Sequence, residues 1–460
     1  MIKIYNTLTR TRDQLKPINE GKVGIYACGP TVYNFIHIGN ARPLCVFDVL
    51  RRYLEWRGLE VNFVQNFTDI DDKLIKKANE EGITVPEVAE RYIAEFWTDA
   101  KGLNIRPATT HPRATENIDE IIALIGRLVD KGYAYESNGD VYFRAARFKD
   151  YGKLSHQPLD ELEAGARIDI SEHKENPMDF ALWKGVKPGE PSWPSPWGDG
   201  RPGWHIECSA MSQKYIGETI DIHCGGQDLV FPHHENEIAQ SEAASGKDFA
   251  HYWMHNGYIN VDNRKMSKSL GNFFTVREVA EKFGYEPIRY LMISSHYRSP
   301  INYSVDILEQ SRAALDRLYN CRENLVFRIK SAESGTRAYS FEPFVDEFIT
   351  AMDDDLNTAD GIAALFNLTK EINTMLGGQP SLEDCRAALD TFDQLTGVLG
   401  LLYNTDDGDD VDAEVEALIE QRTEARRNRD FATADAIRNQ LKEMGIVLED
   451  TPQGVKWSRG

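Results

Sequence analysis

The sequence predicts an α/β protein: a Rossmann-like nucleotide-binding domain that is split by an insertion and followed by a helical bundle and a small C-terminal unit. Three observations support this class. A strand, a glycine-containing turn, a helix and a second strand follow one another near the N-terminus. The character of the chain changes from about Pro112, and beyond residues 265–269 apolar residues recur at helical spacing.

The N-terminal pattern begins with the apolar stretch KVGIYA (22–27), which predicts a strand ending at the turn Cys28-Gly29-Pro30. Gly39 lets the backbone approach a ligand. Apolar residues at helical spacing follow: Val46, Val49, Leu50, Tyr53 and Leu54. VNFVQNF (61–67) predicts the next strand. The N-terminus of the helix in such a βαβ unit is an anion site, so HIGN (37–40) lies where phosphate chemistry would need it.

The expected insertion carries an apolar helical stripe that Gly132 closes: Ile118, Ile121, Ile122, Ile125, Leu128 and Val129. DVYF (140–143) predicts a short strand, and the stretch 187–203, crowded with Pro, Gly and Trp, predicts a loop. The nucleotide-binding fold is expected to resume with DIHCGGQDLVF (221–231) and MHNGYINV (254–261).

Beyond this fold, three-four spacing predicts helices over 306–328, 344–352, 358–376 and 385–402, which indicate a helical bundle. An acidic stretch (406–416) is followed by basic residues that begin at Arg422. This switch is consistent with a linker followed by a solvated helix, and we expect the last fifty or so residues to form a separate small unit.

The composition is typical of a soluble globular protein: 460 residues, 41% hydrophobic and 27% charged, which is enough for about two to four domains. Apolar runs are too short to span a bilayer and the N-terminus lacks a signal peptide, so we expect a cytoplasmic protein. Six scattered cysteines argue against structural disulfides. The net charge of −21 argues against nonspecific coating of nucleic acid, but leaves room for an RNA ligand on a local positive track.

The most specific motif is KMSKS (265–269), in which Lys265 and Lys268 lie three residues apart. A mobile loop with two lysines can stabilise negative charge that develops on phosphorus. Alone, such a loop is usually a solvated surface turn. HIGN, far upstream, supplies a second signature in the expected order.

HIGN and KMSKS together resemble the paired signatures of class I aminoacyl-tRNA synthetases. Four further stretches resemble cysteinyl-tRNA synthetases: ACGPTVY (27–33), NFTDIDDK (66–73), PGWHIECSAM (202–211) and FPHHENEIAQ (231–240). The resemblance resumes in the C-terminal RDFATADAIRNQLKEMGIVLEDTPQGVKW. One departure is Asn40 at the last position of the first signature, where the class has His. Asn can donate a hydrogen bond to phosphate but cannot carry charge.

A candidate metal site follows from this resemblance. Taken alone, each cysteine is a small buried hydrophobe and a histidine near a helix start is usually hydrogen-bonded. His233 and Glu237 lie four residues apart, which would place them on one helical face after Pro232. The resemblance implies that these two hold zinc together with Cys28 and Cys208. Zinc binds a thiolate strongly and an alcohol poorly, so it would select cysteine without editing. Four protein ligands are typical of a closed site, so Glu237, the only oxygen donor, would be the one to yield. The remaining cysteines are interpreted as structural: Cys45, Cys224, Cys321 and Cys385.

The resemblance also implies the reaction: ATP and Mg²⁺ activate L-cysteine as an adenylate, and the cysteine passes to the terminal ribose of tRNA(Cys). The phosphate contacts are expected from His37, Gly39, Asn40, Lys265 and Lys268. The amino-acid pocket is expected to include Thr68, Trp204 and Asp228. The anticodon is expected to contact Arg426, Phe431 and Asp435, with the alternative that Phe431 packs inward. The family is mostly monomeric, so a monomer is expected.

These expectations divide the chain into six parts. They are the first half of the catalytic domain (1–111), the insertion (112–200), the second half (201–262), the KMSKS loop with a stem-contact region (263–320), the helical bundle (321–405) and the anticodon-binding domain (406–460). The insertion is too short for a hydrolytic editing domain. Two alternatives stay open: a ligase that joins cysteine to an amino-sugar, and an inactive paralogue that binds zinc or RNA. A persulfide-forming side activity with pyridoxal phosphate, with Lys73 and Lys76 as candidate lysines, also stays open.

Overall fold

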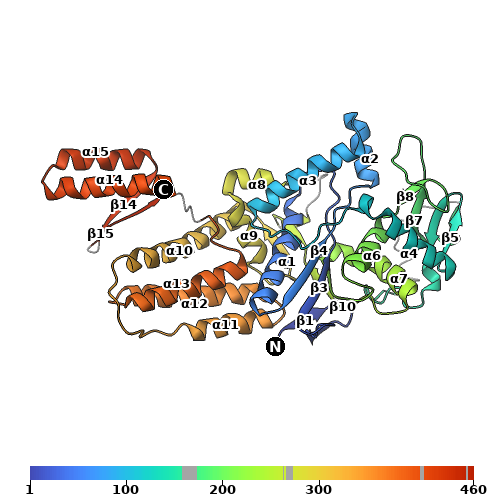
Figure 1. Cartoon of the computed structure of the whole chain (residues 1–460), viewed down its shortest axis with the longest axis horizontal. Helices are drawn as coiled ribbons and strands as arrows, with labels where there is room; N and C mark the ends of the chain where they lie inside the picture. Colours follow the sequence, from blue (N-terminus) through green and yellow to red (C-terminus); the bar gives the residue numbers. More distant parts are fainter. Residues whose placement is uncertain (158–172, 263, 266–272, 405–408, 452–453, 460) are drawn as a thin grey trace. The chain divides into compact units, whose positions relative to one another are not determined.

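The computed structural model describes residues 1–157, 173–262, 264–265, 273–404, 409–451 and 454–459 (Figure 1). The chain forms two compact units. The first contains residues 1–316, 342–367 and 394–401, and the second contains residues 317–341, 368–393 and 402–460. The nucleotide-binding fold lies within the first unit.

A four-stranded parallel sheet in the order β10-β9-β3-β4 forms the centre of the first unit. Its strands are β3 (Lys22–Ala27), β4 (Glu60–Gln65), β9 (Ile220–Gly226) and β10 (Ala250–Asn256). The chain leaves β3 toward β4 on one side and later returns to β9 on the other side of β3. The carboxyl ends of β3 and β9 therefore flank the point where the strand order reverses, which is where open α/β sheets bind ligands.

Helix α1 (Ile38–Trp56) connects β3 to β4 and confirms the predicted strand–helix–strand unit. Its buried residues include Val46, Val49, Leu50, Tyr53 and Leu54, the stripe that the sequence predicts. The helix begins directly after His37, whose backbone is extended. The side-chain oxygen of Asn40 accepts a hydrogen bond from the His37 main-chain N–H at 3.1 Å, which satisfies a donor at the helix start.

The insertion contains α4 (Ile118–Asp130) and an antiparallel sheet in the order β5-β6-β7-β8. Its strands are β5 (Ala134–Ser137), β6 (Asp140–Phe143), β7 (Phe180–Gly185) and β8 (Gly200–Pro202). The insertion shares one hydrophobic core with two helices of the second half, α6 (Trp204–Tyr215) and α7 (Glu235–Ser245). This shared core holds both helices in place.

The helical region begins with α8 (Val276–Phe283) and α9 (Tyr285–Ile293), and four longer helices follow: α10 (Val305–Ile329), α11 (Glu342–Asp353), α12 (Thr358–Leu376) and α13 (Leu382–Leu399). The bounds of α12 are those predicted. Helix α13 ends three residues before the predicted Leu402, because Gly400 adopts a left-handed φ of 66°. A Cβ on Gly400 would also lie 2.1 Å from the guanidinium of Arg289.

The other elements of the first unit are α2 (Asp72–Glu81), α3 (Val85–Gly102), the hairpin of β1 (Lys3–Asn6) and β2 (Thr11–Gln14), and a sheet of β11 (Ile259–Val261), β12 (Arg264–Lys265) and β13 (Ile301–Tyr303). Short 3-10 turns cover Ala114–Glu116, Ala145–Arg147 and Gln227–Leu229.

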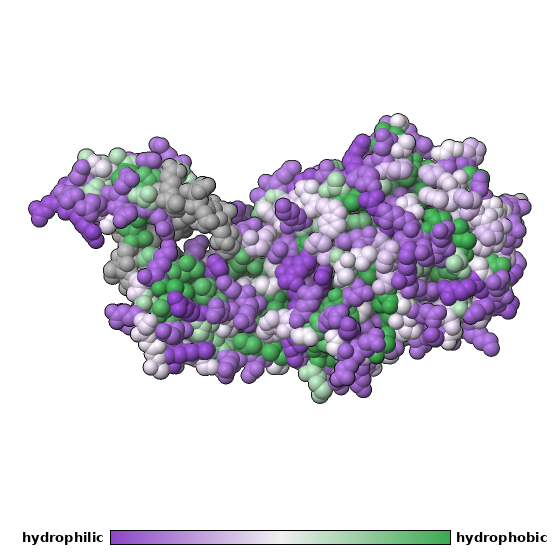
Figure 2. Space-filling view, viewed as in Figure 1, coloured by the Kyte–Doolittle hydropathy of each residue, from purple (hydrophilic) through white to green (hydrophobic). Residues whose placement is uncertain are grey.

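The C-terminal residues form two helices and a hairpin: α14 (Asp409–Arg427), α15 (Phe431–Glu443), β14 (Ile446–Thr451) and β15 (Gly454–Arg459). Val415, Ile437, Leu441 and Ile446 make up a small core of their own. No helix among the described residues is long and apolar enough to cross a membrane. Figure 2 shows hydrophilic residues across much of the visible face.

Candidate active site and metal centre

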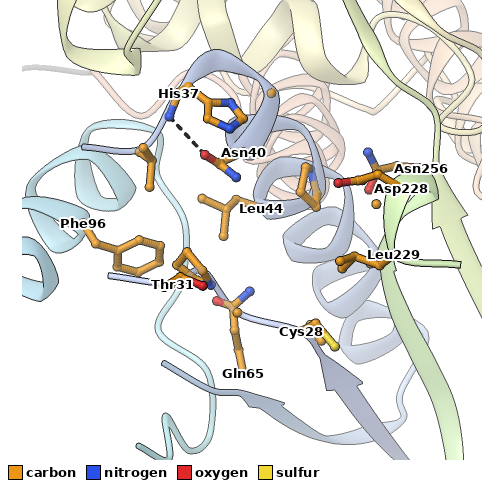
Figure 3. Close-up of a pocket in the computed structure, with 18 of the residues that line it drawn as sticks. Cys28, Thr31, His37, Asn40, Leu44, Gln65, Phe96, Asp228, Leu229 and Asn256 are labelled. Atoms are coloured by element: carbon orange, nitrogen blue, oxygen red, sulfur yellow. Dashed lines mark hydrogen bonds between the residues drawn. The ribbon is translucent and has the colours of Figure 1, made fainter. Parts of the chain in front are cut away.

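A cavity of about 450 Å³ lies at the carboxyl ends of β3 and β9 (Figure 3). Gly29 on its wall illustrates how closely the segments approach there. The Gly29 N–H donates to the side-chain oxygen of Asn66 at 2.9 Å, and a Cβ on Gly29 would lie 1.6 Å from the main-chain oxygen of Asn66. Only glycine fits this turn, which leads the chain from Cys28 into the cavity wall.

The first signature lines this cavity with His37, Gly39 and Asn40. Figure 3 shows the bond from the His37 main chain to Asn40 at the start of α1. The unpaired N–H groups and the dipole of a helix N-terminus attract anions. This wall of the cavity is therefore suited to phosphate.

The lysine signature falls largely outside the described residues, and this includes Lys268. Lys265 ends β12 and pairs in register with Asn260 of β11, whose neighbour Ile259 lines the cavity. On the far side of the loop, the Phe273 ring lies 5.1 Å from the His37 ring.

Main-chain bonds then tie the segment after the loop to the first signature. The Ile38 N–H donates to Phe274 O at 3.0 Å, and the Val276 N–H donates to Ile36 O at 2.9 Å. After the loop, Phe273 thus lines the cavity, and before the loop Lys265 is paired with the strand that contributes Ile259 to it.

The four predicted metal ligands, Cys28, Cys208, His233 and Glu237, lie together, with one donor atom from each all within 4.8 Å of one another. The Cys28 and Cys208 sulfurs are 3.6 Å apart. Oε1 of Glu237 lies 3.4 Å from Cys28 Sγ and 3.1 Å from His233 Nε2. Cys28 also lines the cavity, so the cluster opens onto it.

The position of the helix differs from the sequence prediction. Helix α7 begins at Glu235 rather than at Pro232, and His233 lies in a π-helical turn that precedes it, Val230–His234. His233 and Glu237 nevertheless face each other.

The electrostatics of the cluster favour a cation. Burial, reinforced by the neighbouring Cys208 and Glu237, raises the pKa of the Cys28 thiol well above its usual value. Burial, together with His205 and His223, lowers the pKa of His233 well below its usual value, so this imidazole is neutral. A neutral imidazole and buried sulfurs beside a carboxylate are typical metal ligands, because the charge of the metal supports the thiolate form.

Sequence reasoning missed a group of histidines around this cluster. His223 Nε2 lies 2.8 Å from Glu237 Oε2, and His205 Nδ1 lies 2.8 Å from His233 Nδ1. His234 Nδ1 lies 2.8 Å from His255 Nε2. Such outer partners orient the ligands and select the imidazole tautomer. The only signal in the sequence was the local density of histidine in DIHCGG, PGWHIEC and FPHHENE.

Three family models match successive parts of the chain. Residues 14–313 match the model of the class I (C) tRNA synthetase catalytic domain, residues 347–403 match the DALR domain, and residues 408–457 match the cysteinyl-tRNA ligase anticodon binding domain. The cysteine–tRNA ligase of Clostridioides difficile is 57% identical over 465 residues, and that of Caldicellulosiruptor saccharolyticus is 56% identical over 464 residues. Both alignments cover 100% of each chain. The chain belongs to the cysteine–tRNA ligase family.

Solved structures support the fold of this cysteine–tRNA ligase family member. The methionyl-tRNA synthetase of Mycobacterium tuberculosis, in complex with methionyl-adenylate, superposes with a TM-score of 0.61 at 15% identity and covers 82% of this chain and 89% of its own. The LeuRS of Agrobacterium radiobacter K84, solved with tRNA, also superposes with a TM-score of 0.61. It is 12% identical and covers 84% of this chain and 85% of its own. The predicted α/β class I synthetase fold is confirmed.

The three predicted amino-acid contacts of this cysteine–tRNA ligase family member lie in different surroundings. Trp204 lines the cavity, and its ring lies 4.2 Å from the ring of His233. Asp228 is exposed and also lines the cavity. Thr68 is buried outside the lining, and its hydroxyl donates to Glu207 Oε2 at 2.9 Å.

The three predicted anticodon residues, Arg426, Phe431 and Asp435, are all exposed. Phe431 begins α15 and is 62% exposed, so the alternative that it packs inward is wrong. Asp435 lies one helical turn further along α15, and Arg426 lies in the last turn of α14.

Proposed function

We propose that this protein joins L-cysteine to the 3′-terminal ribose of tRNA(Cys), after activating the cysteine with ATP to cysteinyl-adenylate and pyrophosphate. One observation carries the proposal. A cluster of two thiols, an imidazole and a carboxylate opens through Cys28 onto the cavity whose other wall is the N-terminus of α1. A thiol-selective group and a phosphate site therefore share one cavity.

The activation step needs position and electrostatics rather than a side-chain nucleophile. The cysteine carboxylate attacks the α-phosphorus in line, and pyrophosphate leaves. His37, Gly39 and Asn40 hold the phosphates at the helix N-terminus. Lys265 and Lys268 neutralise the charge that develops toward pyrophosphate, with Mg²⁺ accompanying the nucleotide.

Amino-acid selection rests on the cluster. Its donor set suits Zn²⁺, which takes sulfur, nitrogen and carboxylate oxygen. Zinc held by Cys28, Cys208, His233 and Glu237 would bind the substrate as a thiolate and would bind serine poorly. His223 contacts the second oxygen of Glu237 and so positions the one oxygen ligand. Trp204 lines the cavity beside His233, and Asp228 is suited to the substrate amine. For Thr68 we propose a supporting role through Glu207.

Residues 406–460 are proposed to read the anticodon. Phe431 presents a flat exposed face for stacking, Arg426 a planar cation and Asp435 an acceptor for a base amine. We propose the other five parts of the expected division as well. Residues 1–111 and 201–262 form the catalytic domain, and residues 112–200 form the insertion. Residues 263–320 form the KMSKS loop with the stem-contact region, and residues 321–405 form the helical bundle. We further propose a cytoplasmic monomer.

One assay tests the function against the alternatives. The protein should exchange pyrophosphate into ATP only when cysteine is present, and should then charge tRNA(Cys). Cysteine-dependent exchange followed by transfer to an amino-sugar, and not to tRNA, would point to the other ligase. An absence of exchange would point to an inactive paralogue.

Asn40→Asp is expected to separate helix capping from phosphate contact. The carboxylate keeps an oxygen that can accept from the His37 N–H, so thermal stability should hold. The variant lacks the amide donor and places a negative charge beside phosphate, so KM for ATP should rise by about tenfold or more. Thermal unfolding and pyrophosphate exchange measure the two effects. Equal KM in the variant and the parent would remove Asn40 from the phosphate site.

Removal of residues 406–460 is expected to leave cysteinyl-adenylate formation intact, because both signatures and the metal ligands remain. Transfer to tRNA should fall steeply, and discrimination among anticodons should vanish. Phe431→Ala should weaken charging by roughly 1–3 kcal/mol, the range of one base–aromatic stack.

Val447→Ala is the matched control for Phe431→Ala, since Val447 is an exposed apolar residue in β14 of the same domain. Undiminished charging by the truncated protein would argue against the anticodon assignment.

A further inference from the structure

Arg42 in α1 is a buried cation with an unusual set of partners. Its side chain is 0% exposed. Nη1 donates to Gly257 O at 2.9 Å and to Tyr258 O at 3.1 Å, and Nη2 donates to His296 O at 3.2 Å. All three acceptors are main-chain carbonyls. Among the described residues, no carboxylate bonds this guanidinium, and its Nε has no hydrogen-bond partner.

A buried charge that meets only dipoles is costly. Burial lowers the pKa of Arg42 to about 10, so the group still carries its charge at neutral pH. Arg289, which is also 0% exposed, differs because its Nη2 pairs with Asp48 Oδ2 at 2.6 Å. A cost of this kind is characteristic of functional sites.

Two of the three acceptors of Arg42 belong to the cavity wall. Gly257 and Tyr258 form the turn between β10 and β11, and both line the cavity. On its other side this turn rests on the chain that leads to β13. The Gly257 N–H donates to Tyr297 O at 2.8 Å, and a Cβ on Gly257 would lie 2.6 Å from Arg298 O. Figure 3 shows Asn256, which ends β10, beside α1 and across the cavity from Phe96.

We propose that Arg42 is a positioning residue for ATP: its planar fork holds the β10–β11 turn against α1 and so sets the distance between the phosphate wall and the opposite wall of the nucleotide site. This inference rests on the ATP-dependent function proposed above. Three carbonyls at fixed positions require a fork, which a lysine ammonium cannot reproduce.

Arg42→Met and Arg42→Lys in the full-length protein test the proposal by pyrophosphate exchange at varied ATP and varied cysteine. Both variants should raise KM for ATP by about tenfold or more, as expected when hydrogen bonds to a charged group are lost. KM for cysteine should change by less than about twofold, and bound metal should stay at the parent level. A merely structural residue would not separate the two KM values.

Arg289→Met is the matched control, because Arg289 is equally buried and also bonds main-chain carbonyls, but none of its acceptors lines the cavity. It should lower thermal stability and leave both KM values unchanged. Gly257→Ala changes the turn that accepts the hydrogen bonds of Arg42. Its extra Cβ should shift this turn and raise KM for ATP selectively, which keeps the test valid even if the Arg42 variants do not fold.

A parent-like KM for ATP in Arg42→Lys, or in Gly257→Ala, would overturn the positioning role proposed for Arg42. So would equal changes in the two KM values. If the parent protein itself shows no cysteine-dependent exchange, the proposed function fails instead, and the two failures are thereby distinguished.

Discussion

Cys208→Ser is expected to reduce cysteine activation by more than about 100-fold. Loss of an outer partner of a metal ligand costs about 10- to 100-fold, and loss of a ligand itself should cost more. Cys208 contributes one of the two sulfurs of the cluster and is almost fully buried. A serine hydroxyl there is a poor ligand for zinc, so bound metal should fall below one ion per chain. KM for ATP should move by less than about twofold, because the N-terminus of α1 is unchanged.

The matched control is Cys45→Ser, which makes the same one-atom change at a fully buried thiol in α1 that does not line the cavity. It should keep both the metal and the activation rate. Elemental analysis of the purified protein together with pyrophosphate exchange decides the question. Full activity in parent protein that carries no stoichiometric metal would refute the zinc assignment.

Lys268→Ala is expected to add about 2–4 kcal/mol to the barrier for adenylate formation, which slows that step by roughly 30- to 1000-fold. The described residues before its loop pair with β11, and those after it are bonded to the first signature between Phe274–Val276 and Ile36–Ile38. The residues that follow the loop are therefore bonded to the phosphate wall, and the strand that precedes it is paired with β11, whose Ile259 lines the cavity. Its contact forms mainly in the transition state, so the dissociation constant for cysteine should hardly change.

Single-turnover kinetics with ATP and cysteine measures this effect separately from binding. Lys282→Ala provides the control, since Lys282 is an exposed lysine in the last turn of α8, a short distance along the chain. A Lys268 variant that lost cysteine binding but kept its activation rate would contradict the role proposed for the loop.

Helix and strand bounds were predictable where neighbouring residues alone determine them. The bounds of β3, β6 and α12 match the prediction, because each element is specified by a local sequence pattern. These patterns are the β-rich run of β3, the DVYF segment of β6 and the three-four spacing of α12 before Gly377-Gly378. The start of α7 was not predictable in this way, since proline is favoured at a helix start but also fits the turn that precedes one. Here the turn over Val230–His234 places the helix start three residues later than expected.

The candidate site depended on contacts that periodicity cannot reveal. Cys28 directly follows β3 and Cys208 lies in α6, and no spacing rule links residues that lie 180 positions apart. The four proposed ligands were therefore predictable only from resemblance to a family. The histidines behind them, and the carbonyls around Arg42, were missed because single polar residues show their partners only after the chain has folded.

The distance along the chain between the proposed metal ligands has a consequence for biosynthesis. Cys28 and Glu237 are 209 residues apart. At typical rates of synthesis, roughly 5–20 residues per second, Glu237 leaves the ribosome roughly 10–40 s after Cys28. During that interval the nascent chain carries an unpartnered thiol and no complete ligand set. If zinc binds at this cluster as proposed, all four ligands are available only late in synthesis, so metal loading would be a late event in maturation.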